Sequence, residues 1–118
     1  MTNEEKYEKI KFFADKKDVV GMLGVFQIDD TNQKLEFVKF LKKIDPKLFY
    51  NVHPIIMEEL EKQHKVMDSC VFVLENSKIS QLTKSKLSAY CKEVVEECII
   101  VATAARDLCE IFDMVQQQ

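Results

Sequence analysis

An unbroken apolar repeat in the C-terminal third of the chain constrains the fold most strongly. Nine positions alternate at spacings of four and three residues, and all nine are apolar: Leu87, Cys91, Val94, Cys98, Val101, Ala105, Leu108, Phe112 and Val115. Such spacing places the side chains along one face of an α-helix. The flanking positions are mostly apolar too, where a two-stranded coiled coil carries charges. The repeat therefore predicts a bundle helix from Lys84 to Val115 with several neighbouring helices.

A second long helix is predicted from Pro54 to Glu75. Its apolar seam consists of Ile56, Leu60, Gln63, Met67, Cys70 and Leu74, and Val66, Val71, Phe72 and Val73 widen it. Its C-terminal half is therefore apolar almost all round, which is typical of a central bundle helix or of a surface shared with another subunit. The polar residues 76–83 connect the two long helices, so we expect residues 54–115 to form an antiparallel helical hairpin.

Shorter helices are predicted before the hairpin, and six of the eight phenylalanines lie there, before Tyr50. The first helix starts at a capping box that begins with Thr2 and runs to about residue 16. The next covers residues 19–27 after Asp18, and the third follows the polar residues 29–32 and ends near residue 44. Asp45 and Pro46 then open one or two turns through Tyr50. We expect a break before Pro54, because proline disfavours the helical conformation of the residue before it.

Together these segments predict a single all-α domain over residues 1–118, with two glycines and two prolines to interrupt it. The expected architecture is a compact bundle of about five to six helices. In it, the short, phenylalanine-rich helices of residues 1–50 pack on the long hairpin of residues 54–115.

Charge and hydropathy exclude several functional classes. The formal net charge is −3, and Arg106 is the only arginine, so the sequence argues against nucleic-acid binding. The N-terminus is acidic and lacks the apolar run of a signal peptide. The longest uncharged stretches, Val19–Ile28 and Leu48–Met57, are far shorter than the ~20 residues that a membrane span needs. We therefore expect a soluble, intracellular, cytoplasmic protein.

The four cysteines, Cys70, Cys91, Cys98 and Cys109, show no metal-binding spacing. Cys91 and Cys98 lie two helical turns apart, about 10.5 Å by helical rise, which is too far for a disulfide. We interpret the cysteines as free thiols that pack as small apolar side chains in a reducing compartment. Neither a metal nor another cofactor is expected.

Two short motifs resemble functional ones only in outline. Glu61 and His64 form one Glu-x-x-His half-motif, whereas di-iron bundles need two. We therefore interpret His64 as structural, with Asp68 as its hydrogen-bond partner. Gly21 and Gly24 have the spacing of a backbone-clamping Gly-x-x-Gly loop, but their apolar, helical context favours close packing instead. With two histidines and no phosphate-binding loop, the chain is not expected to be an enzyme.

The function that we predict is non-enzymatic: a protein–protein interaction module, as a small subunit or adaptor of an intracellular assembly. Two adjacent isoleucines interrupt the charged outer face of the last helix, and its final ten residues should extend past Pro54. This apolar surplus predicts contacts with another chain, either a foreign protein or a second copy. The predicted contact residues are Ile99, Ile100, Ile111, Met114 and Val115.

An alternative function is also compatible with the composition. The phenylalanines, together with Met22, Met57 and Met67, could line a core that binds an apolar small molecule or a lipid. An enclosed pocket would favour this alternative, whereas a large exposed apolar patch would favour the interaction module.

Overall fold

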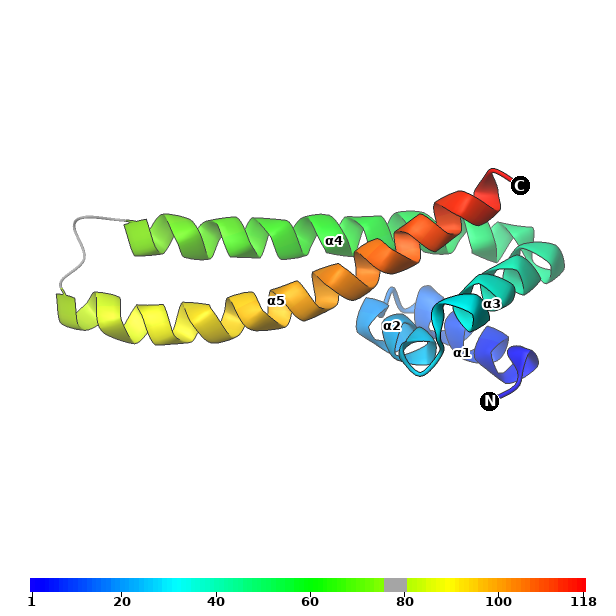
Figure 1. Cartoon of the computed structure of the whole chain (residues 1–118), viewed down its shortest axis with the longest axis horizontal. Coiled ribbons are helices and arrows are strands. Elements are labelled where there is room, and N and C mark those ends of the chain that lie inside the picture. The colour runs from blue at the N-terminus through cyan, green and yellow to red at the C-terminus, as the bar shows by residue number, and fades with distance from the viewer. Residues whose placement is uncertain (76–80) are drawn as a thin grey trace.

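A computed structural model describes residues 1–75 and 81–118, and these residues form five α-helices and no strand. The helices are α1 (Asn3–Asp15), α2 (Val19–Gln27), α3 (Thr31–Ile44), α4 (Pro46–Glu75) and α5 (Gln81–Gln116). The predicted all-α fold with a long C-terminal helix pair is confirmed. Figure 1 shows α4 and α5 side by side along the length of the molecule, with α1–α3 grouped at one end.

Side-chain caps define where the short helices begin. The Thr2 hydroxyl accepts a hydrogen bond from the Glu5 N–H at 3.1 Å, and the Asp18 carboxylate accepts one from the Gly21 N–H at 3.0 Å. Asp30 forms a full capping box, because its carboxylate accepts the Gln33 N–H at 2.8 Å while the Gln33 side chain accepts the Asp30 N–H. These caps satisfy backbone donors that a helix start leaves unpaired.

Helix α4 corrects the predicted break before Pro54, because it continues unbroken from Pro46 to Glu75 with this proline inside it. Asp45 does act as a cap, and its carboxylate accepts the Leu48 N–H at 3.1 Å. An internal proline costs about 3 kcal/mol. Val52 and Ile56 are fully buried on either side of Pro54. Burial of large apolar side chains stabilises by about 1.5–3 kcal/mol each, which is enough to keep the helix continuous.

The continuity of α4 also corrects the predicted overhang of α5. The first turns of α4 lie beside the last turns of α5, where the Phe49 and Phe112 rings stack with their centroids 5.2 Å apart. Ile111 and Val115 are consequently buried. At its other end α5 begins at Gln81, three residues earlier than predicted, and residues 76–80 of the predicted connector lie outside the described part.

The core occupies one end of the molecule. Its largest fully buried side chains come from all five helices: Ile10, Met22, Phe37, Val38, Leu41, Phe49, Val52, Ile56, Phe112 and Val115. The molecule is nevertheless elongated, with principal extents of 56 × 26 × 25 Å. The compact bundle is therefore its base, and the rest of α4 and α5 projects beyond it (Figure 1).

The apolar runs within these helices are short. Among the described residues, no helix has an apolar stretch long enough to cross a membrane.

Candidate interaction surface

The side chains of the hairpin become less buried from its base, where α1–α3 pack, to its tip. Residues seven apart lie on nearly the same side of a helix. On α5, Val115 and Leu108 are 1% and 2% exposed, whereas Val101 and Val94, on the same side, are only half-buried. The cause is the extent of the short helices, since α1–α3 pack against the base of the hairpin only.

We call the projecting part the distal hairpin, which comprises residues 61–75 of α4 and 81–104 of α5. None of these residues belongs to the core. Seven large apolar side chains on it are exposed: Val66, Val71 and Phe72 on α4, and Leu82, Tyr90, Ile99 and Ile100 on α5. Single exposed apolar residues are common on proteins, whereas large contiguous apolar patches are frequent at interaction sites.

Small side chains hold the two helices of the distal hairpin together. Cys91, Cys98 and Ala102 are buried, although they lie outside the core. Cys70 of α4 lies next to Cys91, and burial together with a hydrogen bond to the Cys70 thiol raises the pKa of Cys91. All four cysteines are free. Cys70 is half-buried, and the other three are buried. Their interpretation as small packing residues is confirmed for the three buried cysteines.

The five predicted contact residues separate into two groups. Ile99, Ile100 and Met114 are 50%, 67% and 53% exposed. Ile111 and Val115 are buried within the chain itself, so their prediction as part of a contact surface is corrected. They fill the core because the first turns of α4 lie beside this part of α5. Ile99 and Ile100 belong to the distal hairpin, whereas Met114 lies near the C-terminal end of α5.

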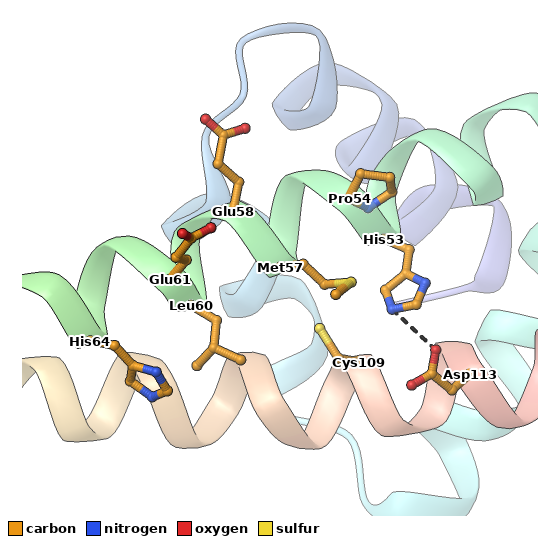
Figure 2. Close-up of a pocket in the computed structure, with 9 residues that line it drawn as sticks. All are labelled: His53, Pro54, Met57, Glu58, Leu60, Glu61, His64, Cys109 and Asp113. Atoms are coloured by element: carbon orange, nitrogen blue, oxygen red, sulfur yellow. Dashed lines mark ion pairs between the residues drawn. The ribbon is translucent and has the colours of Figure 1, made fainter.

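A separate groove of about 530 Å³ lies between α4 and α5 near the base. Figure 2 shows Met57 and Cys109 facing each other across it, with His53 and Asp113 at one end. His53 Nε2 lies 3.3 Å from Asp113 Oδ1. Burial, with a smaller contribution from Asp113, raises the pKa of the Cys109 thiol to about 11. This thiol is therefore protonated at neutral pH, which makes it a poor nucleophile.

His64, at the other end of the groove, has a different partner from the one predicted. Its Nε2 lies 3.5 Å from Nη2 of Arg106, so the contact crosses to α5 instead of reaching Asp68 on the same helix. The guanidinium has only donors, so the ring nitrogen is the acceptor of this contact. Within residues 1–75 and 81–118, no three His, Cys, Asp or Glu side chains come close enough together to hold a metal ion.

Gly21 has a packing role, in agreement with its interpretation from the sequence. A Cβ atom at this position would lie 2.5 Å from the Phe13 ring, so α1 and α2 approach each other too closely for any side chain there. Gly24 has open space around its Cα. The Gly-x-x-Gly spacing thus reflects one packing constraint.

The residues named for an apolar ligand occupy different environments. Met22 is fully buried, and Phe26 and Phe37 pack ring against ring with centroids 5.4 Å apart. Met67 is half-buried in the hairpin, and Met57 is 52% exposed beside the groove. The apolar-ligand alternative stays a prediction.

No protein-family model, curated protein sequence or solved structure matches this chain.

The exposed apolar residues of the distal hairpin were only partly predictable from the sequence. Ile99 and Ile100 were recognisable because they interrupt a charged face. Val66, Val71 and Phe72 were visible as an apolar excess, but the same excess is typical of a helix buried in a bundle. Only the position of α1–α3 distinguishes the two situations.

Proposed function

We propose that this chain is a non-enzymatic protein-interaction module, a small subunit or adaptor that binds another protein chain through the distal hairpin. The observation that supports the proposal is the group of exposed apolar side chains on this projecting element, with Phe72 73% exposed on α4 and Ile100 67% exposed on α5. Leaving such side chains in water forgoes about 25 cal/mol for each Å² of apolar surface. A partner that covers them recovers this free energy.

The chemistry of the groove supports a binding role over a catalytic one. Its thiol, Cys109, is held in the protonated form, and the ring nitrogen of His64 faces the guanidinium of Arg106. The four free thiols also favour a reducing, intracellular compartment, where such cysteines persist without cross-linking. We include that location in the proposal.

The proposal is tested by recovering the assembly from native extract with a tagged chain. Ile100→Glu should remove a stoichiometric partner from the recovered material, because it places a charge in the contact. Val20→Glu is the matched control, since Val20 is 65% exposed, lies on α2 and is remote from the distal hairpin in sequence. Equal recovery of the partner by the Ile100→Glu variant and by the control contradicts the proposal, provided that both variants remain helical.

A further inference from the structure

The residues along one exposed stripe of α5 are ordered so that they complement the same residues read in the opposite direction. Its members follow at spacings of four, three, four, three and four residues, and all are exposed: Leu82, Lys86, Ala89, Glu93, Glu96 and Ile100. This spacing places them along one side of the helix. Leu82 and Ile100, at the two ends, are 71% and 67% exposed. The stripe is therefore an uncovered face with an apolar residue at each end.

The charges of this part of α5 are segregated by sign. Between Gln81 and Ala104 the three basic residues, Lys84, Lys86 and Lys92, all precede the three acidic ones, Glu93, Glu96 and Glu97. Leu82 and Ile100 are each nine residues from Cys91, and Lys86 and Glu96 are each five residues from it. A copy of the helix that runs in the opposite direction about Cys91 therefore presents Glu96 to Lys86 and Ile100 to Leu82.

We propose that a second copy of this chain covers the stripe, with the two α5 helices antiparallel about a two-fold axis level with Cys91. The inference rests on the proposed function, because it names the partner for one part of that surface, the stripe of α5 that contains Leu82 and Ile100. Each interface then contains two leucine–isoleucine contacts and two lysine–glutamate pairs, as a two-fold axis requires. A parallel arrangement would instead place lysines beside lysines and glutamates beside glutamates, which is repulsive.

This register keeps the second copy on the distal hairpin. With Cys91 on the axis, Gln81 of one copy lies level with Val101 of the other, and the core begins four residues later, at Ala105. The facing helix thus ends just before the base of the bundle. Beyond Ile100 the same spacing continues to Thr103, Asp107 and Glu110, which are also exposed, so the second copy covers only the part of the stripe that lies on the distal hairpin.

The contact should be weak and sensitive to salt. From Leu82 to Ile100 the stripe extends about 27 Å at 1.5 Å per residue. A single pair of helices of this length belongs to the small class of interfaces. Its lysine–glutamate pairs are exposed, and at physiological ionic strength charges are screened over about 8 Å. Association should therefore depend on protein concentration and weaken as salt is added.

The test is sedimentation equilibrium of the purified full chain over a range of concentrations. The wild type should form dimers. Lys86→Glu and Glu96→Lys should each weaken dimerisation by about tenfold or more, because each change converts two attractive pairs into two repulsive ones. Lys65→Glu is the control: this lysine lies on α4, its side chain is 75% exposed, and its charge reversal should leave dimerisation unchanged.

An equimolar mixture of the Lys86→Glu and Glu96→Lys chains should dimerise again, since each partner then carries one sign of charge at both positions. A wild type that stays monomeric, or a mixture that stays monomeric, overturns the inference. If the wild type is monomeric, the proposed function still holds when the wild type recovers a foreign chain from extract and the Ile100→Glu variant does not. If the wild type is monomeric and the Ile100→Glu chain also recovers all that the wild type does, both proposals are wrong.

Discussion

Lys6 and Asp29 form a buried ion pair that joins α1 to the segment after α2. Lys6 Nζ lies 2.7 Å from Asp29 Oδ2, and the two side chains are 9% and 6% exposed. The ammonium also lies 5.6 Å from the centre of the Phe37 ring. The two charges are thus held out of water among core residues, where each depends on the other for compensation.

Replacing Asp29 with alanine should lower the free energy of unfolding by about 3–5 kcal/mol, because it leaves the buried ammonium unpaired. The double change Lys6→Met with Asp29→Leu should cost much less, since it removes both charges together. Urea denaturation of the three proteins measures the difference. A single Asp29→Ala variant as stable as the wild type would show that this pair is solvated.

Asp45 should make stability depend on pH in the acidic range. The backbone N–H of Leu48, and next the hydroxyl of Tyr7 at 2.8 Å, lower the pKa of this carboxyl below 3.8. A lowered pKa in the folded state means that the contribution is complete above the unfolded pKa and is lost as pH falls through the folded one. Asp45→Ala should cost about 1 kcal/mol at neutral pH, as for other lost N-caps. This deficit relative to the wild type should shrink below about pH 4 in urea denaturation at several pH values.

Pro54→Ala should stabilise the protein. Alanine restores a backbone N–H inside α4 and removes the ring that crowds the carbonyl four residues earlier, that of Tyr50. The gain should be about 1–3 kcal/mol, reduced by the greater freedom of the unfolded chain. Thermal unfolding measures it. A lower melting temperature for the variant would mean that the groove wall formed by Pro54 stabilises the hairpin more than a regular helix would.

The cysteines should differ in their reactivity toward a disulfide-exchange reagent in the native protein. Half-buried Cys70 should react first, and buried Cys109 should react slowly, because its pKa of about 11 keeps it protonated. Since the folded state binds this proton more tightly, the associated stability is complete below pH 9.0 and is lost as pH rises toward 11. Cys70→Ser should abolish the fast phase, whereas loss of that phase in Cys109→Ser instead would contradict the assignment.

Local patterns determined much of this fold. The caps at Thr2 and Asp18 marked helix starts correctly, because capping involves a side chain and backbone groups within one turn. The 3.5-residue repeat from Leu87 to Val115 predicted α5 and its inner face, because the side chains of a helix repeat in direction regardless of what surrounds them. Both features need only the order of residues in a short stretch of chain.

Tertiary structure decided the features that depend on distant segments. Pro54 signals a break locally, yet α4 is continuous because side chains on both sides of it are buried by other helices. No sequence spacing indicated that Lys6 would meet Asp29. Ile100 and Ile111 lie eleven residues, or about three helical turns, apart on α5, but only Ile111 is buried, because α1–α3 pack at the base of the hairpin and not at its distal part. Periodicity gives the direction of a side chain, and only the packing of the whole chain decides whether another helix lies in that direction.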